Sequence, residues 1–193
     1  SRELNGLALF DLKESMEHKI KEDYLTRYKN DWSEKEIEDT ANTVCIGALK
    51  YGMLKSDNNT QIHFSLSEWL RLDGETGPYL QYVYARSTSI LNKLGTPQEN
   101  MGYTFSEKIE EELLFFIFRF QEFCFHAANT LRPSVVANYL YDLAKQFNRF
   151  YEACPIKGSS EIVKNTRLSL VALTRQTIHD GLKLLGIPSP ERM

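Results

Sequence analysis

The stretch from Gly74 to Arg86 carries residues whose types and spacing suit contact with RNA. Its sequence is GETGPYLQYVYAR. Tyr82 and Arg86 are four residues apart, so on a helix they share one face, one turn apart. A tyrosine ring can stack on an unpaired base while a nearby guanidinium contacts a phosphate. The same spacing also fits a capped helix with a half-buried tyrosine and a surface arginine, and spacing alone favours that simpler interpretation.

Two later stretches could extend such a surface. The segment YLYDLAKQFNRFY ends at Tyr151, four residues after Phe147, where an aromatic ring either protrudes into solvent or caps a core. The last residues, GLKLLGIPSPERM, carry two prolines that stiffen what would otherwise be a frayed tail. Each stretch therefore has a structural interpretation as well as a functional one.

Residue patterns typical of catalysis are absent from the sequence. It has no GxxxxGK[ST], HExxH or GxSxG motif and no closely spaced Cys or His ligands. The histidines and cysteines are scattered over separate elements: His18, His63, His126, His179, Cys45, Cys124 and Cys154. Three widely spaced cysteines predict neither a disulfide framework nor a metal site and fit a reducing compartment. We expect no catalytic residue and no metal site.

Helices are the elements that must position these residues. Apolar residues recur with helical spacing, and the expected helices span about 11–28, from 33 onward, 76–94, 104–128, 133–151 and 161–185. The only plausible strand is the short segment 61–64. The sequence therefore predicts an all-α bundle of about six helices, with a short helical segment at its N-terminal side.

Local signals mark several helix ends and one central helix. Ser33 with Glu36, and Thr104 with Glu107, have the spacing of capping boxes. Six phenylalanines between 115 and 125 cover most of the circumference of the expected fourth helix, which is typical of a helix at the centre of a bundle. The acidic run 110–112 is expected to be a solvated face of that helix.

Composition and charge limit the classes of partner. The chain of 193 residues is 42% hydrophobic, and no apolar run approaches the roughly 20 residues that a membrane span needs. Its net charge of −3 argues against a general binder of nucleic acid, and we expect no DNA. Residues 133–193, however, carry eight basic and five acidic side chains, whereas residues 1–60 and 61–132 are each net acidic. A mildly basic third on an acidic body can bind phosphate at one place.

Taken together and in order, these stretches resemble the C-terminal region of arginyl-tRNA synthetases. The family patterns are GxTGPYLQYxxAR, YLxxLAxxFNxFY and a terminal GLxLLGIxxPERM, and CIGALKY at 45–51 resembles the family's GAxKY helix. The resemblance spans nearly the whole chain. It implies that residues 1–73 are the last part of a catalytic region and that residues 74–193 are an anticodon-binding domain of the DALR type.

The resemblance also implies an activity for the parent protein, the ATP-dependent ligation of arginine to tRNA(Arg) in protein synthesis. That chemistry needs HIGH-type and KMSKS-type motifs, and neither occurs here. Ser1-Arg2-Glu3 resembles the residues just beyond the KMSKS loop. The chain alone is therefore expected to be inactive and without a cofactor, with ATP and Mg²⁺ bound in the catalytic domain. We expect a cytoplasmic monomer that does not contact a membrane.

Matching motif positions assigns roles in anticodon-loop binding. The resemblance implies that Tyr82 and Tyr151 stack on splayed bases, that Arg86 holds a backbone phosphate and that Met193 packs against a loop base. Further phosphate contacts are expected from two cations of the fifth helix, Lys145 and Arg149. Pro155 stands where some relatives have another aromatic residue. The alternative function is a helical docking module for other proteins.

Overall fold

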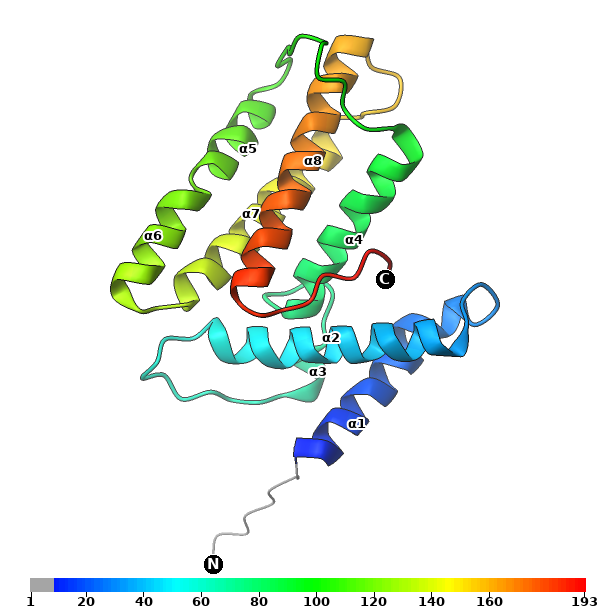
Figure 1. Ribbon diagram of the computed structural model, residues 1–193, viewed down its shortest axis with the longest axis vertical. Coiled ribbons are helices and arrows are strands. Elements are labelled where there is room, and N and C mark those ends of the chain that lie inside the picture. Colours follow the sequence, from blue (N-terminus) through cyan, green and yellow to red (C-terminus); the bar gives the residue numbers. More distant parts are fainter. Residues whose placement is uncertain (1–8) are drawn as a thin grey trace, which may run out of the picture.

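The computed structural model describes residues 9–193, so Ser1-Arg2-Glu3 lies outside the described residues. Within that range the chain is helical and has no strand (Figure 1). The elements in order are α1 (Leu9–Ile20), η1 (Lys21–Leu25), η2 (Thr26–Tyr28), α2 (Glu34–Leu54), α3 (Leu66–Trp69), α4 (Gly77–Leu94), α5 (Lys108–Phe118), α6 (Phe120–Thr130), α7 (Ser134–Ala153) and α8 (Glu161–Leu184). The prediction of an all-α fold is confirmed.

The helices form an upper bundle and a lower layer. Figure 1 shows α4 to α8 running side by side in the bundle, with α2 lying across its lower end and α1 below α2. Helix α7 packs on α5, α6 and α8, and α4 packs on both α8 and α2. The bundle has one apolar core, and a second core joins α1, α2 and the chain around Leu70. Because Tyr82 packs against both cores, α4 links the two layers.

Several helix ends follow from local sequence. Ser33 caps α2 in a reciprocal capping box with Glu36, as the sequence predicts. Thr76 caps α4 by accepting a hydrogen bond of 3.2 Å from the Tyr79 N–H. Gly95 ends that helix and Gly186 lies just beyond the end of α8, with φ of +96° and +66°, a region that favours glycine.

The crossing of α2 and α4 requires small residues. A Cβ atom on Gly77 would lie 2.1 Å from the carbonyl oxygen of Gly47, so the two backbones touch there. Gln81, one turn further along α4, is fully buried at this crossing. Its Nε2 donates to the carbonyl oxygens of Thr43 and Pro188, at 2.9 and 2.8 Å. The amide thus ties α4 to α2 and to the C-terminal tail.

The N-terminal and central parts of the chain differ from the prediction in three places. The segment 61–64 is not a strand, and the short helix α3 follows it. The expected helix 11–28 is α-helical only to Ile20 and continues as a π turn and a 3₁₀ turn. The expected helix 104–128 is two helices that meet at Arg119, whose ψ of −5° interrupts the α conformation.

Phenylalanines on both sides of the break at Arg119 pack on the same residue. They surround one buried ring of α7, that of Tyr139. The ring centroids of Phe116, Phe120 and Phe123 lie 5.1, 5.5 and 4.7 Å from that of Tyr139. These three residues follow the i, i+4, i+7 spacing of one helix face, so they stay on the same side of the chain despite the break at Arg119.

The expectation that the phenylalanine-rich helix is central was wrong. Phe115, Phe118 and Phe125 are each 71% exposed, so the outer face of α5 and α6 carries phenylalanines that the described residues leave uncovered. The central helix is α7, which packs on four of its neighbours in the bundle. Sequence periodicity shows how apolar residues are distributed around a helix but does not show how many neighbours cover them.

Glu110 also differs from the prediction of a solvated acidic face. It is fully buried, whereas Glu111 and Glu112 are exposed. Its carboxylate accepts from the Glu107 N–H at 3.0 Å and pairs with Arg167 of α8 at 2.6 Å. The capping box of α5 is therefore formed by Glu107 and Glu110, and the predicted box at Thr104 is wrong.

Candidate nucleic-acid interface

Two adjoining cavities lie along the outer side of α4 and share Arg86 and Ser89. We call them together the α4 groove. The first, of about 290 Å³, is lined by Tyr28, Trp32, Tyr82, Ala85, Arg86, Ser89, Glu191, Arg192 and Met193. The second, of about 530 Å³, is lined by Arg86, Ser89, Ile90, Lys93, Leu94, Tyr151, Pro155, Ile156 and Lys157. The four residues assigned to anticodon contact from their motif positions all line this groove.

Arg86 and Tyr151 come from different helices and meet in the groove. The guanidinium carbon of Arg86 lies 4.6 Å from the ring centroid of Tyr151, a cation–π arrangement. The ring of Tyr151 also packs on that of Phe147, at 6.2 Å between centroids. The Tyr151 ring is thus partly buried against the core and partly accessible from the groove.

The other end of the groove is walled by aromatic residues from before α2. The rings of Tyr28 and Trp32 are stacked with centroids 4.5 Å apart, and the Arg192 guanidinium carbon lies 4.6 Å from the Trp32 centroid. Tyr82 is half-buried beside them. Trp32 is only 7% exposed, so the surfaces open to a ligand at this end are those of Tyr28, Tyr82 and Arg192. Aromatic and guanidinium surfaces of this kind suit stacking on unpaired bases.

The C-terminal tail is held in place by side chains of three elements. Lys50 of α2 donates to the Gly186 carbonyl, and Gln81 of α4 donates to that of Pro188. The Tyr28 hydroxyl donates to the main-chain oxygen of Met193 at 3.1 Å. The Met193 side chain packs into the second core and is only 9% exposed. The tail is thus a fixed wall of the groove, and Met193 presents a small part of its surface.

Lys145 and Arg149 lie outside both cavities. Lys145 pairs with Asp142 at 2.7 Å, and that hydrogen bond raises the pKa of the Lys145 ammonium group. Arg149 is exposed and donates to Gln146 on its own helix. The structure does not bring these two cations together with the four groove residues.

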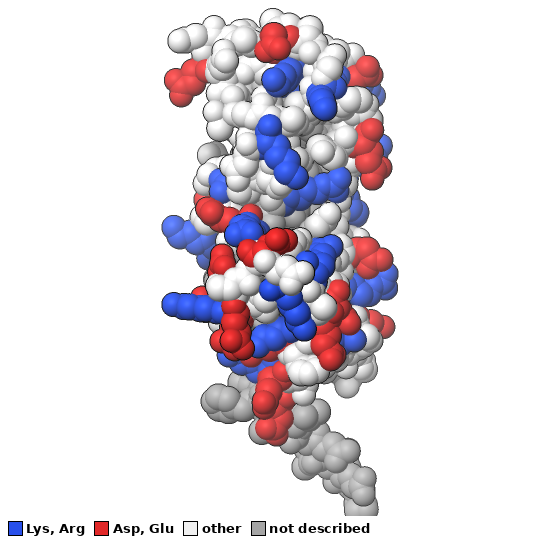
Figure 2. Space-filling model, turned by 90° about the vertical axis from the view of Figure 1, so that its right-hand side faces the viewer, with Lys and Arg blue, Asp and Glu red and all other residues white. Residues whose placement is uncertain are grey.

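Charge on the groove side is unevenly distributed. Figure 2 shows the face that points to the right in Figure 1, on the side of α4 and the C-terminal tail. Lys and Arg side chains gather along the middle of its upper half, and acidic side chains there lie toward the edges. In the lower half the two signs are mixed. A polyanion that follows this face would meet attraction mainly in the upper half.

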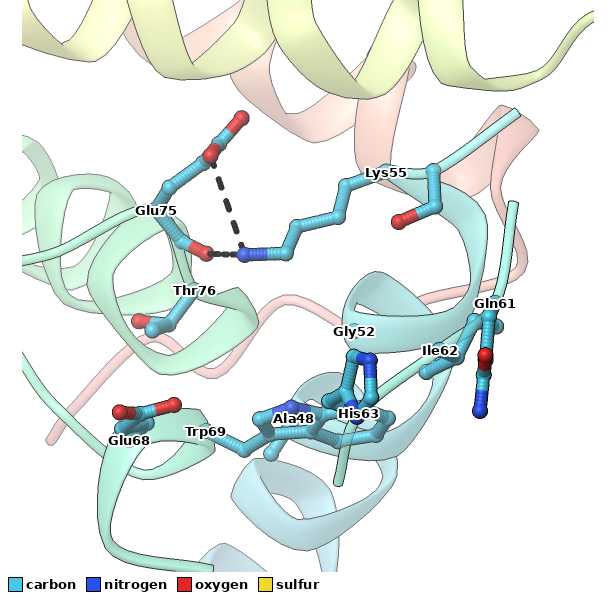
Figure 3. A pocket seen from close by; sticks show the side chains of 11 residues that line it. Ala48, Gly52, Lys55, Gln61, Ile62, His63, Glu68, Trp69, Glu75 and Thr76 are labelled. Atoms are coloured by element: carbon cyan, nitrogen blue, oxygen red, sulfur yellow. Dashed lines mark hydrogen bonds and ion pairs between the residues drawn. The ribbon is translucent and has the colours of Figure 1, made fainter. Parts of the chain in front are cut away.

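A third cavity, at the other end of α4, has a different character. It measures about 140 Å³ and lies between the end of α2, α3 and the start of α4. Lys55 points at Glu75 across it (Figure 3), with Nζ 3.0 Å from the Glu75 carbonyl oxygen and 3.8 Å from its carboxylate. Glu68 also lines it. Because its one lysine is already paired, this cavity does not suit a phosphate.

Burial makes the three cysteine thiols weaker acids. Burial raises the pKa of the Cys45 thiol to about 11, and Cys124 and Cys154 shift in the same direction for the same reason, so all three are inert at neutral pH. Residues 9–193 contain no group of three or more His, Cys, Asp or Glu side chains that could hold a metal ion. None of the described helices is long and apolar enough to cross a membrane.

One known protein family matches the part of the chain that contains most of the groove residues. The family model described as the DALR anticodon binding domain matches residues 80–193. The chain belongs to the DALR anticodon-binding domain family. The matched range contains Tyr82, Arg86, Tyr151 and Met193. The first cavity of the groove is also lined by Tyr28 and Trp32, which precede the residues matched by the family model.

Curated relatives of the chain include arginine–tRNA ligases of several bacteria. The chain is 40% identical, over its whole length, to the arginine–tRNA ligase of Bdellovibrio bacteriovorus, covering 34% of that protein. It is 39% identical, over 85% of its length, to the arginine–tRNA ligase of Alteromonas mediterranea, covering 29% of it. The chain thus spans about a third of the length of the curated relatives it matches. The resemblance to arginyl-tRNA synthetases is confirmed.

Solved structures agree with the sequence comparison. Arginyl-tRNA synthetase of Thermus thermophilus matches with a TM-score of 0.84 and 33% identity, over 95% of this chain and 31% of that one. The enzyme of Plasmodium falciparum matches with a TM-score of 0.84 and 26% identity, over 97% of this chain and 34% of that one. The chain is therefore similar in both fold and sequence to one part of these synthetases.

Sequence reasoning missed several groove residues. Lys93 lies seven positions after Arg86, a spacing that keeps it on the same side of α4, so the pattern could have identified it. Trp32, Arg192 and Lys157 come from the turn before α2, from the tail and from a loop. No periodicity connects these segments, and only their packing places them at one groove.

Proposed function

We propose that this chain binds the anticodon loop of tRNA(Arg) as part of an arginine–tRNA ligase. Tyr82 and Tyr151 stack on bases splayed out of the loop, and Arg86, between them, contacts the connecting phosphate. Met193 packs its exposed edge against a loop base. The arrangement of Tyr82, Arg86 and Tyr151 along one groove is the observation that carries this proposal.

The chemistry of the groove supports single-stranded RNA as the ligand. Stacking on tyrosine requires bases whose faces are free, and these occur in loops, whereas the bases of a duplex are stacked on each other. Arg86 forms no ion pair with any residue in the range 9–193, so its donors are available to a phosphate. Lys145 and Arg149 contact phosphates further along the RNA, Lys145 by leaving Asp142.

The parent activity follows as part of the same proposal. Arginine is ligated to tRNA(Arg) in the cytoplasm by a monomeric enzyme, with ATP and Mg²⁺ bound by the catalytic region. A role as a protein docking module is less favoured, because the family match points to anticodon binding and the named relatives are tRNA ligases.

The direct test is binding of the chain to a cognate tRNA(Arg) anticodon stem-loop and to one with its central anticodon base changed. We expect tighter binding of the cognate RNA by fluorescence anisotropy. Replacing Tyr151 by Ala should cost about 1–3 kcal/mol of binding free energy, the range for one lost base stack. Tyr151→Phe should be mild, since the ring is retained.

The matched control is Tyr103→Ala, because Tyr103 is 58% exposed but lines neither cavity of the groove. It should leave binding unchanged. Thermal melting of each variant separates lost binding from lost folding. Equal affinity of the wild-type chain for both stem-loops, or arginine-dependent pyrophosphate exchange by this chain alone, would refute the proposed function.

A further inference from the structure

The larger cavity of the α4 groove is lined by three cations and by no carboxylate. Arg86 and Lys93 come from α4, and Lys157 comes from the loop between α7 and α8. Both lysines are exposed. The remaining lining consists of Tyr151, hydroxyl-bearing Ser89 and apolar side chains. A concavity with this lining has a positive potential that is not neutralised from within.

None of these three cations has an ion-pair partner in the part of the chain that the structure describes. Other cations of the molecule do have partners. Lys55 pairs with Glu75, and Lys145 pairs with Asp142. An unpaired cation at a concave surface can bind an external anion without first giving up an internal partner.

The positions of the cations along the cavity follow from the helix and the loop. Arg86 and Lys93 are seven residues apart on α4, which places their backbones about 10 Å apart at 1.5 Å per residue. They therefore suit two different phosphates better than a single one. Ser89 lies between them on the same side of the helix.

The loop that carries Lys157 is anchored, which fixes its place opposite α4. Cys154 and Ile156 are buried, with 0% and 3% exposure. Arg167 of α8 donates to the Pro155 carbonyl, and Ser159 donates to the Ile156 carbonyl at 2.9 Å. Lys157 therefore follows a buried residue and projects from a fixed backbone, so little ordering is needed before it meets a ligand.

We propose that this cavity binds the sugar–phosphate backbone of the RNA strand that continues from the bases held by Tyr82 and Tyr151, with Lys93 and Lys157 as phosphate contacts. The inference rests on the proposed function, because the cavity is continuous with the base-stacking end of the groove through Arg86 and Ser89. It adds a sequence-independent contact next to the sequence-dependent one. Pro155 lines the cavity without an aromatic ring, so it leaves room for a backbone and offers no surface for a further stacked base.

The test is the salt dependence of stem-loop binding by Lys93→Gln, Lys157→Gln and the double variant. Each lost phosphate contact should reduce the log–log slope by about 0.7–0.9, so the double variant should lose about twice that. The loss of affinity should be equal for the cognate and the base-changed stem-loop, because a phosphate contact does not distinguish bases.

The matched control is Lys183→Gln, since Lys183 is exposed, has no ion pair with a described residue and lines neither cavity of the groove. Its slope should equal that of the wild type. A double variant with an unchanged slope, in a chain that still prefers the cognate stem-loop, would overturn the cavity proposal and leave the proposed function standing. A wild-type chain without base preference would refute the proposed function, and the slopes would still decide the phosphate contacts.

Discussion

Two arginines of the bundle have contrasting environments. Arg167 of α8 has a side chain that is 8% exposed and donates to Glu110, to the Ser106 hydroxyl and to the Pro155 carbonyl. Arg86 of α4 lies at a cavity, faces the Tyr151 ring and has no carboxylate partner among the described residues. A guanidinium whose donors are satisfied inside the protein holds helices together, whereas one with free donors at a cavity is available to a ligand.

The same contrast separates the two ends of α4. At its start, the cavity of Figure 3 holds a lysine that is already paired with Glu75. At its other end, the groove holds Arg86, Lys93 and Lys157 without such partners. Net charge therefore says little about where this protein binds an anion, and the pairing of individual charges says more.

The largest expected effect is the loss of stability when the ion pair between Arg167 and Glu110 is broken. Glu110→Gln should lower the free energy of unfolding by about 3–5 kcal/mol, because it leaves the Arg167 charge buried without its partner. Urea unfolding measures this change. The control is Glu111→Gln, an exposed neighbour that should stay within about 0.5 kcal/mol of the wild type. A loss below about 1 kcal/mol for Glu110→Gln would show that the pair is not structural.

For Arg86→Gln we expect the opposite, a larger effect on RNA binding than on stability. Binding of the anticodon stem-loop should weaken by about 1.5–3 kcal/mol, the range for a hydrogen bond to a charged group. Stability should fall by no more than about 1 kcal/mol, since only the cation–π contact with Tyr151 is lost. Anisotropy titration and urea unfolding on one preparation give both numbers. If stability falls and binding per folded molecule does not, Arg86 belongs with Arg167 as a structural cation.

Of the two arginine environments, that of Arg167 should respond to acid pH, because only Arg167 has a carboxylate partner among the described residues. Burial would raise the pKa of Glu110, but hydrogen bonds from Arg167 and from the Glu107 and Ser106 N–H groups outweigh it and hold the pKa below its usual value. The folded state then binds fewer protons than the unfolded state in acid. The contribution of Glu110 is therefore complete above about pH 4.5, its ordinary pKa, and is lost as pH falls through the folded value.

Unfolding free energies of the wild type and Glu110→Gln between pH 7 and pH 3 test this expectation. The difference between the two proteins should shrink as the pH falls, because the variant has no carboxyl group to titrate at that position. A constant difference over the whole range would mean that protonation of Glu110 does not contribute to acid unfolding.

The smallest effect is expected at the cavity of Figure 3. Lys55→Gln should change stability by about 0.2–1 kcal/mol, the usual range for an ion pair that is partly exposed to solvent. The salt dependence of stem-loop binding should be that of the wild type, since Lys55 is already paired. A reduced slope would move part of the phosphate site to the start of α4.

The sequence by itself determined the features that depend on neighbours within one or two turns. The capping box of Ser33, the start of α4 at Thr76 and its end at Gly95 follow from local hydrogen bonds and backbone conformation. The shared face of Tyr82 and Arg86 follows from the helical repeat. Motif order also identified the family, because whole segments with their spacing are far more specific than any single residue.

Only the tertiary structure decided which side chains meet across helices. Phe115 and Phe123 have the same residue type on adjoining helices, yet one is exposed and the other packs on Tyr139, because only one has a neighbour on its side. Glu110 and Glu111 differ for the same reason, since Arg167 lies on one side of α5 alone. Lys157 reaches the groove because buried Ile156 and a bond from α8 anchor its loop. These outcomes depend on contacts between residues far apart in the chain, which no local pattern of apolar or charged residues encodes.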